Sequence, residues 1–123
     1  MAKKIAIITG ASGGIGREFT RLLAEEQLDE IWAVARNEEK LDALRQEYGE
    51  CICPMTVDLA KQQERRKIEQ RLAGEKPLVV WLINNAGMAR MGACTEFSVG
   101  EIEATVNINC SAVAVLCTIC IPY

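Results

Sequence analysis

Short apolar runs alternate with amphipathic stretches from the beginning of this chain. A run that is apolar at nearly every position predicts a strand that is covered on both faces of a parallel sheet. Runs of this kind occur at Lys4–Thr9, Ile31–Ala35, Cys51–Val57 and Leu78–Ile83. Pro54 interrupts the third run. Because proline has no backbone N–H to donate, it indicates a strand at the edge of the sheet.

The stretches between these runs have the spacing of amphipathic helices. The first helix is expected to start at Gly14. The second has Asn37 as its N-cap residue and Gly49 as its stop signal, and a third, more polar helix covers Lys61–Ala73. The apolar positions expected to face the sheet are Ile15, Phe19, Leu22 and Leu23 in the first helix, Leu41, Leu44 and Tyr48 in the second, and Ile68 and Leu72 in the third.

The pattern changes after the fourth predicted strand, Leu78–Ile83. A loop that contains two glycines covers Ala86–Glu96, and Ser98 and Glu101 then form a capping-box signature for a long helix that ends before Pro122. Repetition of strand and helix with short connections predicts an open parallel sheet of the α/β class. No linker or repeat divides residues 1–123, so a single domain is expected.

The first predicted strand leads into a glycine-rich turn, Thr9–Gly16, which has the sequence TGASGGIG. Glycines in such a turn let the backbone approach a phosphate closely, and the free N–H groups at the helix start favour negative charge. The turn therefore predicts a nucleotide-binding site. Gly10, Gly14 and Gly16 fit the spacing T-G-x-x-x-G-x-G. Gly10, Gly13 and Gly16 fit G-x-x-G-x-x-G equally well, so the glycines alone leave two subtypes open.

A second motif, Asn84–Gly87 (NNAG), directly follows the last predicted strand. A turn of small residues there lies at the carboxyl end of a strand, where open α/β sheets bind their ligands. With both motifs, the chain resembles the short-form members of the short-chain dehydrogenase/reductase family. The resemblance implies a Rossmann-type doubly wound parallel sheet, here the N-terminal part of a three-layer α/β/α fold.

The resemblance also implies an oxidoreductase that transfers hydride between a nicotinamide cofactor and a small carbonyl or alcohol substrate. The alternative is a non-catalytic nucleotide-binding or interaction module, because one fold hosts many functions. The expected cofactor-binding positions are Gly10, Ser12, Gly14, Ile15 and Gly16 in the turn, Arg36 and Asn37 after the second strand, Asp58 and Leu59 after the third, and Asn85, Ala86 and Gly87 after the fourth.

The end of the second predicted strand favours NADP(H) over NAD(H). Ala35 stands where NAD-binding relatives carry an acid for the ribose 2′-hydroxyl, and Arg36 follows it. A guanidinium can bind a 2′-phosphate with two hydrogen bonds. NAD(H) is the alternative, since Arg36 could be merely solvated and Gly13 stands where some NADP-binding relatives have a basic residue. Asp58, placed at the adenine by the resemblance, would by itself be an equally good helix N-cap.

The resemblance assigns one catalytic position. The spacing to Pro122 matches Asn109, rather than its rival Asn107, to the family's asparagine that holds a water of the proton relay. The family's acid/base motif, Tyr-x-x-x-Lys, is absent, because neither Tyr48 nor Tyr123 is followed by such a lysine. The chain is therefore expected to be the cofactor-binding half of a longer enzyme and to be inactive by itself.

Composition excludes several other classes of site. The chain has 14 Lys and Arg against 17 Asp and Glu with the signs interspersed, so no nucleic-acid-binding surface is expected. Cys117 and Cys120 have the spacing of half a zinc site, but the chain has no histidine and no second pair of this kind, so no metal site is expected. The 6 cysteines are expected to be reduced thiols, and the start of the chain does not resemble an export signal, so a cytoplasmic location is expected.

The last apolar stretch bears on membranes and on association. Cys110–Ile121 is shorter than the roughly 20 residues that span a bilayer, so no membrane span is expected. Apolar residues point nearly all round the helix that contains it, and the strand Leu78–Ile83 has no charge to discourage pairing at an open edge. We therefore expect a homo-oligomer.

Overall fold

The computed structural model describes all residues, 1–123, and has an α/β fold. A 4-stranded parallel sheet with the strand order β3-β2-β1-β4 forms its centre. This order confirms the predicted doubly wound arrangement, in which the chain first moves outward from β1 and then returns to its other side. The strands are β1 (Lys4–Thr9), β2 (Glu30–Ala35), β3 (Ile52–Thr56) and β4 (Leu78–Ile83).

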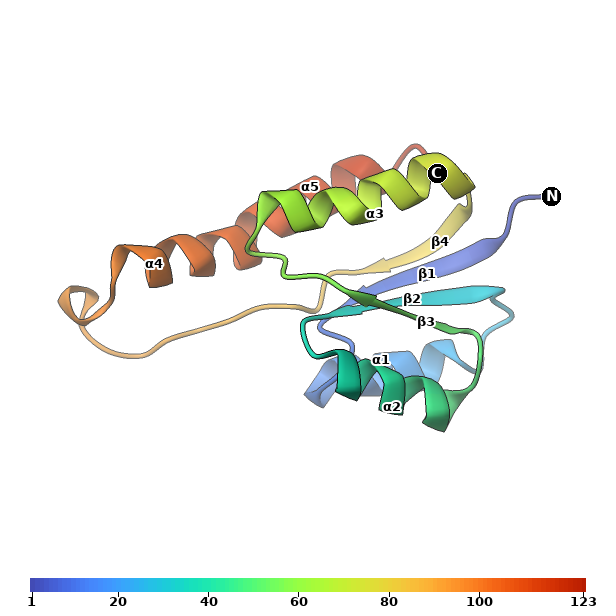
Figure 1. The fold of residues 1–123 in the computed structure, drawn as a ribbon, viewed down its shortest axis with the longest axis horizontal. Coiled ribbons are helices and arrows are strands. Elements are labelled where there is room, and N and C mark those ends of the chain that lie inside the picture. The colour runs from blue at the N-terminus through green and yellow to red at the C-terminus, as the bar shows by residue number, and fades with distance from the viewer.

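Helices cover both faces of the sheet and make three layers (Figure 1). The helices α1 (Gly14–Leu23) and α2 (Glu38–Tyr48) lie on one face. On the other face lie α3 (Gln62–Glu75) and α5 (Ala112–Cys120), the second of which continues α4 (Val99–Val106). Short connections of other types are η1 (Cys94–Glu96) and the π-helical η2 (Asn107–Ser111).

The core divides into two clusters, one on each face, because successive side chains of a strand point to opposite sides. Ile5 and Ile7 of β1 pack with α3 and α5, whereas Ala6 and Ile8 pack with α1 and α2. The same alternation places Trp32 in the first cluster, where the Arg71 guanidinium of α3 lies 4.1 Å from its ring centre. The apolar runs therefore identified all four strands, and β1 and β2 are buried as expected. The expectation that Leu78–Ile83 is covered on both faces is wrong, because β4 lies at an open edge with Leu78, Val80 and Trp81 exposed.

The predicted element ends are mostly confirmed. The Asn37 side chain caps α2 by accepting a hydrogen bond from the Lys40 backbone N–H, and Gly49 ends this helix with a φ of 101°. Ser98 and Glu101 form the expected reciprocal capping box of α4. Pro54 lies in β3, which is an edge strand.

The predicted sheet-facing side of α1 is wrong. Of its four expected core positions only Leu23 is buried, and Ile15, Phe19 and Leu22 are 71%, 38% and 49% exposed. Gly16 and Thr20 take their place against the sheet. The cause is the backbone approach at Gly16, which sets the rotation of the helix about its axis. A Cβ at Gly16 would lie 1.8 Å from the Gly10 carbonyl oxygen, so only a bare backbone fits there.

The C-terminal helix is longer than the apolar stretch suggested. α4, η2 and α5 form one continuous helix, Val99–Cys120, of 22 residues, which by length and composition alone could cross a membrane. These bounds agree with the long helix expected between the capping box at Ser98 and Pro122, whereas the expectation of no membrane span considered only its apolar part, Cys110–Ile121. Core helices of soluble proteins pass the same test but are mostly buried, whereas only 11% of the most apolar part of this helix is buried in the structure. Here Ala112, Leu116 and Cys120 are buried against the sheet, and burial raises the pKa of the Cys120 thiol to about 11.

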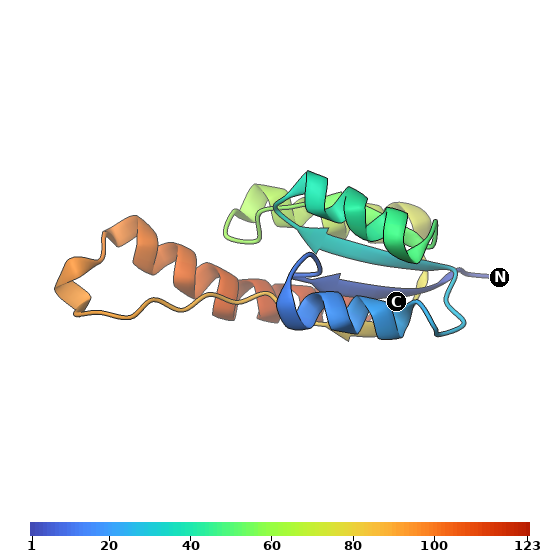
Figure 2. The same ribbon diagram turned by 90° about the horizontal axis from the view of Figure 1, so that it is seen from below.

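α4 and the loop before it extend beyond the sheet (Figure 2). The loop leaves β4 and runs out beside the helix, and an ion pair between Arg90 and Glu101 joins the two at 3.3 Å. The opposite end of the helix returns to the sheet, where the Tyr123 carbonyl accepts a hydrogen bond from the Val79 N–H.

Candidate nucleotide-binding site

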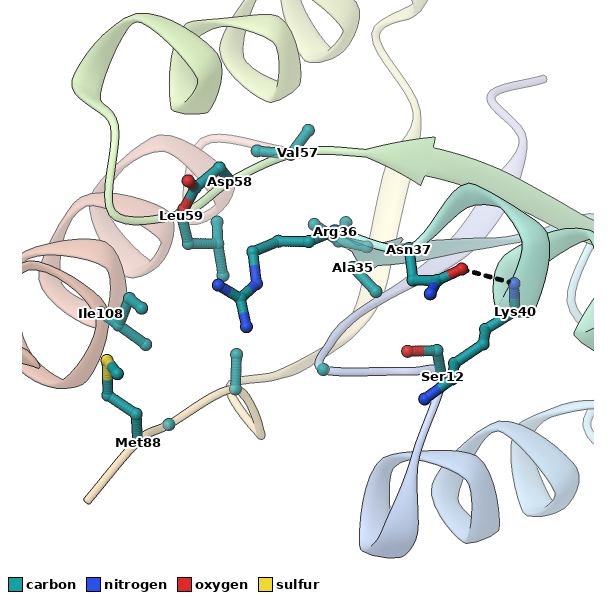
Figure 3. A pocket seen from close by; sticks show the side chains of 14 residues that line it. Ser12, Ala35, Arg36, Asn37, Lys40, Val57, Asp58, Leu59, Met88 and Ile108 are labelled. Atoms are coloured by element: carbon teal, nitrogen blue, oxygen red, sulfur yellow. Dashed lines mark hydrogen bonds between the residues drawn. The ribbon is translucent and has the colours of Figure 1, made fainter. Parts of the chain in front are cut away.

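A pocket of about 570 Å³ opens where the carboxyl ends of the strands meet (Figure 3). β1 and β4 are neighbours here although β2 and β3 lie on the other side of β1, so this is the switch point at which open α/β sheets bind ligands. The lining residues are Gly10, Ser12, Val34, Ala35, Arg36, Asn37, Lys40, Val57, Asp58, Leu59, Ala86, Gly87, Met88 and Ile108.

The turn after β1 is packed against the turn after β4. Gly10 has a φ of 63°, a left-handed conformation that favours glycine, and a Cβ there would lie 3.0 Å from the Ala86 Cα. The Asn85 side chain donates a hydrogen bond from Nδ2 to the Gly10 carbonyl at 3.2 Å. The two sequence motifs are therefore in direct contact and form one wall of the pocket.

Thr9 fixes the second motif from the end of β1. Its buried hydroxyl oxygen accepts hydrogen bonds from the backbone N–H groups of Asn85, at 3.1 Å, and Ala86, at 2.9 Å. This role was missed in the sequence analysis. The only signal for it was a hydroxyl residue at the end of a buried strand, and no local pattern indicates which distant backbone it contacts.

The end of β2 supplies positive charge and no carboxylate. Arg36 turns its side chain into the pocket toward Leu59, and Lys40 extends from α2 toward Ser12 (Figure 3). Arg17, Arg21 and Arg71 all form ion pairs, whereas neither Arg36 nor Lys40 has one. Ala35 leaves the position of the expected acid without charge. This part of the pocket therefore suits an anion.

Asp58 and Leu59 form the wall after β3. The Asp58 carboxylate accepts a hydrogen bond from the Ala60 N–H at 3.0 Å, while the N-cap of α3 is Lys61, so the alternative of Asp58 as the N-cap is wrong. The Asp58 N–H in turn donates to the Glu64 carboxylate, which lowers the pKa of Glu64. Nearly buried Arg65 donates to the Leu59 carbonyl at 2.8 Å. These contacts hold the turn rigidly against α3.

Gly87 lines the pocket, and Asn109 lies next to it outside the lining. The Asn109 side chain bonds to the backbone of Met88, and a Cβ on Gly87 would lie 3.2 Å from its Oδ1 atom. The rival residue, Asn107, donates instead to the Ala60 carbonyl at 3.3 Å. Both asparagines belong to the π-helical segment η2, so the helix is irregular where the family asparagine was expected.

The pocket brings together most of the expected cofactor-binding positions. Eight of the expected residues line it: Gly10, Ser12, Arg36, Asn37, Asp58, Leu59, Ala86 and Gly87. Gly14, Ile15, Gly16 and Asn85 do not line it, and Gly16 and Asn85 instead hold the turns together. The other six lining residues were not among the expected cofactor-binding positions: Val34, Ala35, Lys40, Val57, Met88 and Ile108. No group of three or more His, Cys, Asp or Glu residues is placed to hold a metal ion.

The fold and the pocket define a Rossmann-type nucleotide-binding structure. The family described as short chain dehydrogenase matches residues 4–123, and the chain belongs to this family. An uncharacterized short-chain type dehydrogenase/reductase of Sinorhizobium fredii is 35% identical over 111 residues, which are 89% of this chain and 42% of the relative.

Solved structures show the same relationship. A short-chain dehydrogenase from Sphingobium yanoikuyae in complex with NADPH has a TM-score of 0.85 and 32% identity, over 97% of this chain and 48% of that one. A bulky-bulky ketone specific alcohol dehydrogenase from Comamonas testosteroni has a TM-score of 0.83 and 32% identity, over 94% of this chain and 47% of that one. The chain thus spans about half the length of these proteins.

Proposed function

We propose that this chain is the cofactor-binding half of an NADP(H)-preferring oxidoreductase that transfers hydride between the nicotinamide and a carbonyl or alcohol substrate. The observation that carries the proposal is the end of β2, where Ala35 replaces the expected acid and Arg36 points into the pocket without an ion-pair partner. A similar structure binds NADPH, which supports the choice.

The residues of the pocket fit such a cofactor. The bare backbone of Gly10 in the pocket wall and the first N–H groups of α1, at Gly14 and Ile15 just outside the lining, would provide a cradle for a pyrophosphate. Asp58 and Leu59 fit the adenine end, Arg36 the ribose phosphate, and Ala86 and Gly87 the neighbouring ribose. When bound, the nicotinamide supplies or accepts the hydride, and the protein binds and orients it.

Asn109 is proposed to position the loop at the reacting end and, through its place in η2, to hold a water of a proton relay. Its contact with Met88 fixes the backbone just after Gly87. A Tyr-x-x-x-Lys motif does not occur in residues 1–123. We therefore propose that acid/base chemistry depends on residues outside this segment and that residues 1–123 by themselves do not turn over substrate.

A second candidate is a non-catalytic nucleotide-binding module, because one fold hosts many functions. Binding and turnover separate the two. In equilibrium titrations with NADPH and NADH, NADPH should bind at least about tenfold more tightly, which corresponds to about 1.4 kcal/mol. Equal affinities would overturn the NADP(H) preference. Turnover of ketones or alcohols by the complete gene product supports the enzyme, and binding without turnover supports the module.

The protein is also proposed to form a homo-oligomer and to lie in the cytoplasm. The edge strand β4 exposes Leu78, Val80 and Trp81, which supports a homo-oligomer or an association that covers this edge. The six cysteines are free, which fits a reducing compartment such as the cytoplasm. A small-molecule substrate is proposed, and no nucleic-acid or membrane partner.

A further inference from the structure

The position of Lys40 follows from the cap of α2. Its backbone N–H donates to the Asn37 side chain at 3.0 Å, which places Lys40 in the first turn of the helix. Side chains in a helix lean toward its N-terminus, so one in the first turn extends over the helix start. Here that direction leads into the pocket, where the Lys40 side chain reaches toward Ser12 (Figure 3).

Lys40 and Arg36 both line the pocket on either side of Asn37, with Lys40 directed toward Ser12 and Arg36 turned toward Leu59 (Figure 3). Neither cation is neutralised by an ion pair, although the chain has an excess of acidic residues. Glu38 and Glu39, the acidic residues beside them in α2, do not line the pocket, and its only acidic lining residue is Asp58 after β3. The Ser12 hydroxyl adds a hydrogen-bond donor between the β1 turn and α2.

We propose that Lys40 is a specificity-determining residue that binds the 2′-phosphate of NADP(H) together with Arg36 and the Ser12 hydroxyl. This inference rests on the proposed function and adds a residue to it. A phosphate monoester carries nearly two negative charges at neutral pH and several acceptor oxygens, so two cations and one hydroxyl match it better than one arginine does. Lys40 thereby supplies from α2 the second basic group that the glycine turn lacks at Gly13.

Lys40→Gln tests this contact, because it removes the charge while keeping a long polar side chain. Adenosine 2′,5′-bisphosphate and 5′-AMP are suitable ligands, since they differ only in the 2′-phosphate. By calorimetric titration, Lys40→Gln should weaken binding of the bisphosphate about tenfold and change binding of 5′-AMP less than about twofold. Lys40→Arg should retain most of the discrimination, which separates a contact with the phosphate from a structural effect.

Arg45→Gln is the matched control, since Arg45 is an exposed cation on the same helix that does not line the pocket. It should leave both affinities unchanged. If Lys40→Gln weakened binding of both ligands equally, or of neither, the assignment of Lys40 would be overturned. The NADP(H) preference would still stand as long as the wild-type protein binds the bisphosphate more tightly than 5′-AMP. Failure of the wild-type protein to distinguish the two ligands would instead overturn the proposed preference itself. Raising the salt from 0.05 to 0.5 M should reduce the discrimination of the wild type more than that of Lys40→Gln.

Discussion

The side chain of Asn109 forms two hydrogen bonds with the backbone of Met88. Its Nδ2 donates to the Met88 carbonyl at 2.6 Å, and its Oδ1 accepts from the Met88 N–H at 2.9 Å. The amide of Asn109 therefore continues the hydrogen bonding of the loop as a neighbouring strand would. Because Met88 lines the pocket, this pair couples the irregular segment of the helix to the end of the proposed cofactor site.

Asn109→Ala removes both hydrogen bonds and should lower the free energy of unfolding by about 1–2 kcal/mol, since the pair is exposed to solvent. Urea denaturation followed by circular dichroism measures this loss. Cys110→Ala, a change at the next position of the helix, which is also exposed, is the control and should lie close to the wild type. If the two variants are equally stable, the contact with Met88 does not hold the loop.

Thr9→Val keeps the shape of the side chain and removes the acceptor for two backbone N–H groups. Stability should fall by about 1–3 kcal/mol, because those groups lose their partner in a partly buried turn. Nucleotide binding should weaken as well, since Ala86 lines the pocket. Thr56→Val, at the exposed end of β3, should have little effect on either quantity.

Gly16→Ala should be severely destabilising, because its Cβ would lie 1.8 Å from the Gly10 carbonyl oxygen. Overpacking of this kind costs about 1–3 kcal/mol and more where backbone atoms must move. Gly13→Ala is the control, since a Cβ there meets nothing within 4 Å and the residue has a φ of −150°. Thermal unfolding of the two variants should differ widely. A Gly16→Ala protein as stable as Gly13→Ala would mean that the backbone contact is not as close as described.

Arg36→Ala should weaken NADPH binding by about 1–3 kcal/mol and NADH binding far less, because only NADPH offers a phosphate to the guanidinium. Titration followed by nicotinamide fluorescence measures both affinities. Equal losses for both cofactors would contradict the proposed contact, and would indicate that Arg36 lies against a part that they share.

The isolated chain should self-associate at micromolar concentration. β4 presents an unpaired edge with exposed Val80 and Trp81, and α1 exposes Ile15, Phe19 and Leu22 on the face of the sheet toward which Trp81 points. Light scattering with mass analysis would detect assemblies larger than the 13.6 kDa chain. Trp81→Lys should shift the distribution toward the monomer. A wild-type chain that remains monomeric would contradict the prediction.

The strands and most helix ends were predictable because their signals are local. The apolar run Ile5–Ile8 predicted a strand and is buried, whereas the equally apolar run Leu78–Ile83 forms a strand at an exposed edge. The cap residues Asn37 and Ser98 satisfy backbone groups a few positions away. The repeating strand-helix pattern predicted a parallel sheet, and the doubly wound order of its strands was what the family resemblance implied. In this part of the fold, local preference and tertiary structure agree.

The rotation of α1 was not predictable from hydrophobic spacing. Ile15, Phe19 and Leu22 form the more apolar stripe, yet the close contact of Gly16 with Gly10 turns a different side to the sheet. This contact is made by the backbones of two glycines, which have no side chains, so a pattern of apolar side chains does not predict it. The motif spacing contained this information, because the third glycine is the one that packs helix against strand.

The site was predictable where residues follow strand ends directly and was incomplete elsewhere. Arg36 directly follows β2 and Asp58 lies two residues after β3, so their place at one edge of the sheet follows from topology. Lys40 lies inside a helix and reaches the pocket only because the cap at Asn37 sets its direction. Thr9 acts through backbone atoms of a segment far away in the chain, which no spacing reveals.

The different burial of the two tryptophans gives this protein two optical reporters. Trp32 is 0% exposed beneath Arg71, whereas Trp81 is 51% exposed at the open strand edge. We expect the emission of Trp32 to lie to the blue of that of Trp81, and a soluble quencher such as acrylamide to reach mainly Trp81. Fluorescence therefore distinguishes loss of the core from coverage of the edge in a single unlabelled sample.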